Sequence, residues 1–261
     1  MGDGEGTVDL RQEVISLRGR LERVEELLSR SSGEGEHVHD HGLDSLYYAF
    51  EEKFRGPREE ILERLQVYLP YLRETDGGKR GEPALDLGCG RGEWLELLSK
   101  EGWKVRGVDQ NRPALEVCRK RGLDVTEEDL FRVLAKAGDG STALVTAFHV
   151  VEHLPFEAVI RLLDETVRVL RPGGVAIFET PNPDNIMVGA RNFYLDPTHR
   201  NPVPSAVLQF FCEARGLSRV EVLNLHPVPY KARVRGICSA ARRMNQLFSG
   251  PQDYAVVGRR P

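Results

Sequence analysis

A glycine-rich run near residue 90 carries the first chemistry in the sequence. Asp86 precedes three evenly spaced glycines, Gly88, Gly90 and Gly92, where an apolar run gives way to a helical pattern. Glycines let the backbone turn sharply and approach a ligand closely, because they have no Cβ. The free N–H groups and the dipole of the following helix face the same ligand. We therefore expect a nucleotide-type cofactor at this turn.

The spacing within this run indicates the kind of cofactor. A dinucleotide fingerprint has two residues between its last two glycines, whereas a single residue separates Gly90 from Gly92. The carboxylate of Asp86 would also repel a pyrophosphate. It suits a ligand that carries an ammonium group and no phosphate, such as the methionine moiety of S-adenosylmethionine.

Acidic and histidine side chains follow the ends of later apolar runs. Asp109 stands 21 residues after Gly88, where a carboxylate can accept both ribose hydroxyls of an adenosine. Asp129 and His149 follow two further runs. The expected strands are 84–87, 105–108, 123–125, 143–148 and 174–178, with a helix over 156–170 and a turn at 171–174. This alternation predicts an α/β fold with a doubly wound, mostly parallel sheet, whose ligand crevice lies at the carboxyl ends of its strands.

With these motifs the sequence resembles the class I S-adenosylmethionine-dependent methyltransferases. The resemblance implies S-adenosylmethionine as cofactor and a Rossmann-like sheet closed by an antiparallel pair at 222–225 and 254–258. It also implies that Asp129 and the apolar residue after it meet the adenine. The cofactor-binding residues expected on this basis are Asp86, Gly88, Cys89, Gly90, Gly92, Asp109, Gln110, Asp129, Leu130 and Phe148.

A cluster of histidines and a glutamate offers catalytic groups. On a helix start, His149, Glu152 and His153 would share one face, because they lie three and four residues apart. Together with His199 they make a set suited to a divalent metal such as Mg²⁺. All four are candidate metal ligands; the three histidines are candidate catalytic residues, with His149 and His199 the preferred bases. Three interpretations stay open: a metal site, a general base without metal, and hydrogen bonds that support the nearby loop.

A proline-rich segment follows the predicted fifth strand and is expected to face the cofactor crevice. Its polar, aromatic and histidine groups indicate substrate handling. The candidate substrate-binding residues are Asn182, Tyr194, Asp196 and Arg200. The alternative is structural, with Phe193 and Tyr194 in the core and Asp196 capping a turn.

Five segments resemble the bacterial methyltransferases of polysaccharide assembly, such as the methyltransferase module of the O-antigen polymannose chain terminator. They lie at 48–60, 88–96, 146–154, 179–183 and 193–202. The resemblance covers residues 43–261. It implies O-methylation of a sugar hydroxyl, or of a sugar-linked phosphate, on a glycan or lipid-linked saccharide.

Two other functions remain open. Glu152 and His153 match part of the E-x-x-E-H run of the ubiquinone-pathway O-methyltransferases and of metal-assisted sugar methyltransferases for small-RNA ends. His149 replaces the first glutamate of that run. A small metabolite is therefore an alternative acceptor. The other alternative is a non-catalytic scaffold of a polysaccharide assembly complex; the intact Asp86, glycine and Asp109 set favours the enzyme.

The chain is expected to fall into four parts. These are a coiled-coil helix (1–30), a flexible linker (31–42), a helical lid (43–80) and the methyltransferase domain (81–261). Heptad spacing from Leu10 to Leu28 predicts the coiled coil, which forms a homo-oligomer or packs on its own chain. Asp44 is expected to cap the first lid helix. Tyr47, Phe50 and Arg55 are candidate lid residues over the substrate.

The composition excludes several classes of protein. The 261 residues carry a net charge of −4, which does not indicate a nucleic-acid binder. The four cysteines lack C-x-x-C spacing, so neither a disulfide framework nor a zinc cluster is expected. The sequence shows neither a signal-peptide pattern nor an apolar run of membrane-spanning length, and a cytoplasmic location is expected.

The carboxyl-terminal part differs in charge. Residues 230–261 contain seven Lys and Arg residues against one acidic residue, Asp253, a local excess of +6. A helix is expected over 229–244. Its basic face would contact phosphate, an anionic glycan or a membrane surface, or would simply be solvated.

Overall fold

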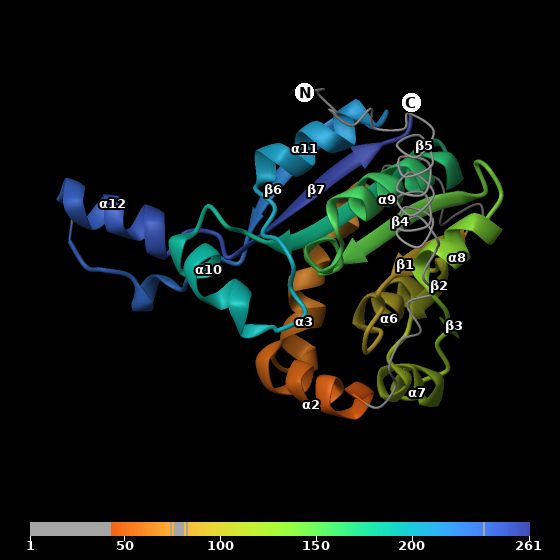
Figure 1. Ribbon diagram of the computed structural model, residues 1–261, viewed down its shortest axis with the longest axis horizontal. Helices are drawn as coiled ribbons and strands as arrows, with labels where there is room; N and C mark the ends of the chain where they lie inside the picture. Colours follow the sequence, from red (N-terminus) through yellow and green to blue (C-terminus); the bar gives the residue numbers. More distant parts are fainter. Residues whose placement is uncertain (1–42, 74, 76–80, 82, 237) are drawn as a thin grey trace, which may run out of the picture. The chain divides into compact units, whose positions relative to one another are not determined.

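A seven-stranded sheet forms the centre of the computed structural model, which describes residues 43–73, 75, 81, 83–236 and 238–261 (Figure 1). The strands are β1 (Pro83–Leu87), β2 (Lys104–Asp109), β3 (Val125–Glu127), β4 (Thr142–Phe148), β5 (Leu170–Pro181), β6 (Ser218–Leu225) and β7 (Asp253–Arg259). Their order in the sheet is β3-β2-β1-β4-β5-β7-β6. The first five strands pair in parallel, and β7 runs antiparallel to both β5 and β6. The predicted doubly wound, mostly parallel sheet is confirmed, as is the closing antiparallel pair.

Helices cover both faces of this sheet. Those before and between the strands are α2 (Asp44–Phe54), α3 (Arg58–Leu65), α4 (Leu69–Arg73), α6 (Glu93–Lys100), α7 (Arg112–Lys120), α8 (Leu130–Lys136) and α9 (Phe156–Val169). Later in the chain come α10 (Ile186–Ala190), α11 (Ser205–Ala214) and α12 (Ser239–Phe248). Short 3-10 turns are η2 (Gln66–Tyr68), η3 (Val151–His153), η4 (Asn192–Leu195) and η5 (Tyr230–Ala232).

The core has two layers because strand side chains alternate between the faces of the sheet. On β5, Val175 and Ile177 pack into one cluster, whereas Ala176 and Phe178 pack into the other. The first cluster includes residues of α3, α6 and α7, and the second includes residues of α8, α9 and α11. Both layers are thus anchored on the same strands, whose ends carry the polar residues described below.

The turn between β1 and α6 requires glycine. Gly88 and Gly92 have φ values of +73° and +77°, in the left-handed region. A Cβ on Gly88 would lie 2.6 Å from Cγ2 of Val150, and one on Gly92 would lie 2.7 Å from Cδ1 of Leu123. The sequence prediction of a tight turn with close backbone approach is therefore correct.

Three local predictions are wrong. Residues 171–174 were expected as a turn, but they belong to β5, because the N–H of Gly173 bonds to Arg260 and the carbonyl of Gly174 accepts from Arg260. The basic helix begins at Ser239 rather than at 229, after a 3-10 turn and a Gly236 with φ of +133°. Asp44 does not cap its own helix; its carboxylate accepts the N–H of Arg112 at the start of α7.

The described helices contain none long and apolar enough to cross a membrane. The predicted coiled coil (1–30) and linker (31–42) lie outside the described residues, as do residues 76–80 at the end of the predicted lid.

Candidate active site

A pocket at the glycine turn is the candidate cofactor site. It is lined by Asp86, Gly88, Cys89, Glu93, Trp94 and Phe148, together with Arg55, Ile61 and Leu65 from the lid. Nε1 of Trp94 is buried without a hydrogen-bond partner among the described residues. A buried acid, an indole N–H without a partner and a turn that a Cβ would fill fit a small zwitterionic ligand.

Asp86 is the buried acid of this pocket. It is 2% exposed, and its carboxylate accepts the hydroxyl of Thr146 at 2.7 Å. Burial raises the pKa of Asp86 to about 7, although the Thr146 hydroxyl and the charge of Arg55 act in the opposite direction. A cation beside it would restore its charge.

Asp86 leads to a prediction about proton release. Without ligand the folded protein holds a proton on Asp86 up to a pKa of about 7, so its stability falls as the pH rises from about 4 towards 7. A bound ammonium group favours the carboxylate. We expect S-adenosylhomocysteine to release about one proton on binding at pH 6. Calorimetry in buffers of different ionisation enthalpy measures this, and equal proton release by Asp86→Asn would contradict the assignment.

Asp109 shapes the same turn from the end of β2. Its two oxygens accept the N–H groups of Gly90 and Asn111, each at 2.8 Å. Each oxygen keeps a lone pair for a ribose hydroxyl. The two backbone hydrogen bonds fix the orientation of the Asp109 carboxylate. Its predicted contact with a ribose stays a prediction.

A line of alternating carboxylates and imidazoles crosses the carboxyl end of the sheet. His149, after β4, has Nδ1 3.2 Å from Glu152 and Nε2 3.4 Å from Glu179. On the far side of Glu179, Nδ1 of His226 lies 3.9 Å from that carboxylate and 3.0 Å from Asp253. Residues from β4, β5, β6 and β7 thus meet at one edge, as expected for strand ends.

His149 is held between two negative charges. Burial alone would lower the pKa of His149, but the hydrogen bonds to Glu152 and Glu179 outweigh burial and raise it well above its usual value. The same bonds keep the pKa of Glu152 and of Glu179 below the usual range, although burial acts the other way. The favoured state is an imidazolium between two carboxylates.

Glu152 also belongs to a second cluster, with His153 and His199, whose ligand atoms lie within 4.8 Å of one another. His149 is not a member, contrary to the prediction that 149, 152 and 153 share a helix face. The reason is local: His149 has φ of +56° and precedes a 3-10 turn that starts at Val151. Three of the four predicted metal ligands are nevertheless brought together.

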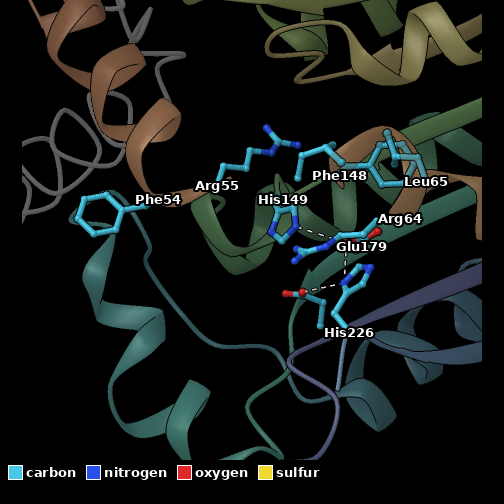
Figure 2. Close-up of a pocket in the computed structure, with 10 residues that line it drawn as sticks. Phe54, Arg55, Arg64, Leu65, Phe148, His149, Glu179 and His226 are labelled. Atoms are coloured by element: carbon cyan, nitrogen blue, oxygen red, sulfur yellow. Dashed lines mark hydrogen bonds and ion pairs between the residues drawn. The ribbon is translucent and has the colours of Figure 1, made fainter. Parts of the chain in front are cut away.

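A cavity of about 200 Å³ opens beside His149 and Glu179, and the cluster of Glu152, His153 and His199 is not part of its lining (Figure 2). His149, Glu179, His226 and Asp253 form its sheet side. Its lid side comes from α2 and α3 and the residues around them: Phe54, Arg55, Ile61, Arg64 and Leu65. Arg55, Ile61, Leu65 and Phe148 line both this cavity and the cofactor pocket. The two spaces are therefore adjacent, as a donor and an acceptor site must be.

The comparison with known proteins gives the family. Residues 54–222, more than half of the chain, match the methyltransferase domain family. The chain belongs to this family. A crystal structure of a SAM-dependent methyltransferase from Archaeoglobus fulgidus is 32% identical to it, with a TM-score of 0.75 over 82% of this chain and 99% of that chain.

Two curated relatives of this methyltransferase are named ubiquinone biosynthesis O-methyltransferase. The one from Alkalilimnicola ehrlichii is 30% identical over 56% of this chain and 61% of its own length. The one from Sodalis glossinidius is 34% identical over 44% of this chain and 47% of its own length. The chain thus spans about half to three fifths of these relatives. Their names agree with the small-metabolite alternative rather than with the polysaccharide resemblance.

The remaining predicted cofactor residues follow β2 and β3 and have mixed roles. Asp129 accepts the N–H groups of Phe131 and Arg132, so it caps α8. Leu130 packs against the second core cluster, and Gln110 is half-buried after β2. Their contact with an adenine stays a prediction.

The predicted substrate residues, Asn182, Tyr194, Asp196 and Arg200, differ in their exposure and in their hydrogen bonds. Asn182 is buried and supports its loop through Asp184 and Pro251, and Arg200 is exposed with its backbone bonded to Glu152.

Tyr194 is 64% exposed, so the alternative that places it in the core is wrong. Phe193 is buried, as that alternative expected. Asp196 does bond within its turn, to Thr198, but it also faces the lid.

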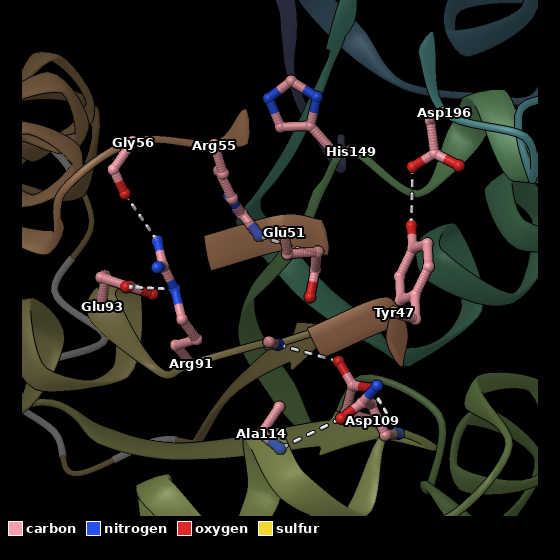
Figure 3. Close-up of polar contacts among 12 residues, drawn as sticks. Tyr47, Glu51, Arg55, Gly56, Arg91, Glu93, Asp109, Ala114, His149 and Asp196 are labelled. Carbon is pink, nitrogen blue, oxygen red and sulfur yellow. Dashed lines mark hydrogen bonds and ion pairs between the residues drawn. The ribbon is translucent and has the colours of Figure 1, made fainter. Parts of the chain in front are cut away.

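The lid of the methyltransferase is tied to this loop. The hydroxyl of Tyr47 on α2 donates to Asp196 at 2.8 Å, while Arg91 of the glycine turn donates to the carbonyl of Gly56 (Figure 3). The guanidinium of Arg55 lies 3.3 Å from the position of a Cβ on Gly90. Arg55 lines both the cofactor pocket and the cavity, and Phe50 packs between Tyr47 and Phe54. That these residues cover the substrate stays a prediction.

The Tyr47 contact gives a second prediction. Tyr47→Phe removes the hydrogen bond to Asp196, worth about 1.5–3 kcal/mol, and a longer one accepted from Thr198 at 3.4 Å. We expect the KM for the acceptor to rise about tenfold with kcat within about threefold, because the lid closes less often over an intact site. Steady-state kinetics measure the split. Tyr48→Phe is the control, since Tyr48 bonds only to Glu52 on its own helix among the described residues.

Proposed function

We propose that this chain is an S-adenosylmethionine-dependent O-methyltransferase. The observation that carries the proposal is the polar cavity next to the cofactor pocket, with carboxylates and imidazoles on its sheet side. The cofactor supplies an activated methyl group. The protein then has to align an acceptor oxygen and remove its proton, for which such groups are suited.

We further propose that Glu152, His153 and His199 hold a divalent metal. Nδ1 of His199 donates to the carbonyl of Phe193 at 2.7 Å, and Nδ1 of His153 bonds to the hydroxyl of Thr198 at 2.9 Å. Such outer contacts fix the orientation of metal-binding imidazoles and leave Nε2 for the ion. Burial also lowers the pKa of His153, which favours the neutral form that binds metals. A metal there would supply Lewis-acid help to an acceptor hydroxyl.

Metal binding is tested without activity. Calorimetry with Mg²⁺ and Mn²⁺ should give one site in the wild-type chain and none in His199→Ala. The matched control is His226→Gln, which removes an imidazole that bonds to Asp253 and lies beside Glu179 rather than the cluster, and it should keep the site. Equal binding by wild type and His199→Ala would remove the metal assignment.

The acceptor is proposed to be a hydroxyl of a small metabolite, in line with the relatives named for ubiquinone biosynthesis. A sugar hydroxyl of a glycan or lipid-linked saccharide is the second candidate. It is favoured by the cavity wall, because Glu179 and Asp253 offer acceptors for several hydroxyl groups while Arg64 offers donors.

A panel of acceptors tests the proposed function. The chain is incubated with S-adenosylmethionine labelled in the methyl group and with catechol-type phenols, free sugars and lipid-linked saccharides. Label in a phenol supports the first candidate, and label in a saccharide supports the second. No transfer to any acceptor, in a protein that binds the cofactor, would favour the scaffold instead.

Two partner proposals remain. A homo-oligomer formed through residues 1–30 predicts a change in mass by light scattering when they are removed. The basic segment around α12 is proposed to contact an anionic surface. Its exposed cations include Arg235, Arg242 and Arg243, and the large side chains of Tyr230 and Met244 in the same segment are exposed as well.

A further inference from the structure

His226 and Asp253 form a carboxylate–imidazole pair in the wall of the cavity. His226 directly follows β6 and Asp253 begins β7, so two antiparallel neighbours bring the pair together. Nδ1 of His226 donates to Oδ2 of Asp253 at 3.0 Å. A carboxylate behind Nδ1 fixes the tautomer in which Nε2 is unprotonated and able to accept a proton.

The free nitrogen distinguishes His226 from the other histidine in this wall. Both His149 and His226 line the cavity (Figure 2). Both nitrogens of His149 face carboxylates, at 3.2 and 3.4 Å, which leaves none for an acceptor. Nε2 of His226 has no hydrogen-bond partner among the residues that the structure describes.

The backbone conformation of His226 also indicates a functional role. His226 has φ of +52°, a conformation that side-chain-bearing residues rarely adopt. It is held there by its neighbours: the N–H of Gln252 bonds to the carbonyl of Leu225, and Nε2 of Gln252 donates to the carbonyl of His226. Strain that the surroundings enforce is concentrated at functional sites.

We infer that His226 is the general base that deprotonates the acceptor hydroxyl, with Asp253 as its positioning residue. The inference rests on the proposed O-methyltransferase function. The acceptor oxygen forms its bond to the methyl carbon while the carbon–sulfur bond of the donor breaks. The sulfur keeps that electron pair, and the hydroxyl proton passes to Nε2 of His226.

The charges around His226 suit the imidazolium that results. Asp253 from β7 and Glu179 from β5 lie 3.0 and 3.9 Å from Nδ1. Tyr68 of η2 donates to the other oxygen of Glu179 and holds that carboxylate in place. Positive charge enters the cavity from Arg55 and Arg64 at its lid side and from His149 beyond Glu179.

The test compares His226→Gln and Asp253→Asn with the control Asp124→Asn. Asp124 is an exposed carboxylate of an ion pair, and it directly precedes β3, the edge strand opposite β6. Cofactor affinity and melting temperature establish that each variant folds. We expect kcat to fall about 100-fold or more in His226→Gln, with the affinity for S-adenosylhomocysteine within about twofold. The decline of the rate at low pH should also disappear. Asp124→Asn should behave as wild type.

A second readout does not need activity. Nitrogen-15 NMR of the wild-type chain should show His226 with its proton on Nδ1, and Asp253→Asn should change this tautomer. A proton on Nε2 in the wild type, or a kcat loss below about fivefold in a folded His226→Gln, would overturn the inference. Calorimetric loss of a bound cation in His226→Gln would overturn it too, by assigning Glu179, His226 and Asp253 to a metal. An inactive wild type with the expected tautomer would instead refute the proposed function.

Discussion

Replacement of Gly88 by alanine is expected to reduce the affinity for S-adenosylhomocysteine by at least about a hundredfold and to lower the free energy of unfolding by about 3 kcal/mol. The new Cβ would lie 2.6 Å from Cγ2 of Val150, and the residue would keep φ of +73°. The left-handed conformation costs about 1–2 kcal/mol and overpacking about 1–3 kcal/mol. Isothermal calorimetry and denaturant unfolding measure the two effects.

Two further variants separate the clash from the backbone strain. Gly102→Ala places alanine at φ of +83° with no atom within 4 Å, so it carries the strain alone. Gly88→Ala combined with Val150→Ala removes the clash and should recover part of the affinity. If Gly102→Ala weakens ligand binding as strongly as Gly88→Ala, the close approach at the turn is not the reason for glycine.

The fold could be predicted because its signals are local. The spaced glycines, the apolar runs and the polar residue after each run all lie within short stretches, and each stretch forms one strand and one turn. Glu152 and His153 are likewise neighbours in the sequence. The segment 193–202 follows the fifth strand, so His199 could be predicted at the same end of the sheet. Family and fold therefore follow from the sequence to a large extent.

The second half of the polar line could not be predicted, because its members are far apart in the chain. Glu179, His226 and Asp253 meet only since β7 inserts between β5 and β6. No spacing in the sequence reports that order. One signal in the sequence did indicate these residues. Each of the three stands at or near the end of a strand, and Glu179 ends an apolar run at the start of the segment 179–183. The sequence also does not show that His149 has a positive φ, which keeps it out of the metal cluster.

Glu152→Gln is expected to reduce kcat by about a thousandfold or more and to destabilise the fold by about 1.5–3 kcal/mol. The side chain is fully buried and accepts bonds from His149 at 3.2 Å and Thr180 at 2.8 Å, with Nε2 of His199 3.9 Å away. Glutamine loses the charged hydrogen bond to His149, whose imidazolium is then left with Glu179 at 3.4 Å. The proposed metal would lose its only carboxylate ligand in the cluster as well. Chemical unfolding, metal calorimetry and kinetics measure the three losses.

The pH dependence of stability tests the ion pair itself. The pKa of Glu152 is lowered, so its share of the stability is present above the ordinary pKa of a glutamate and is lost as the pH falls through the lowered value. The pKa of His149 is raised, so its share is complete below the ordinary pKa of a histidine and is lost as the pH rises through the raised value. The shares of Glu152 and His149 are therefore both complete between these two ordinary pKa values, and Glu152→Gln should lower the stability most in that range. Thr180→Val is the matched control, because it removes one hydrogen bond and leaves both charges. If Glu152→Gln costs the same at every pH, or no more than Thr180→Val, the charge of Glu152 is not what holds His149 and this edge of the site in place.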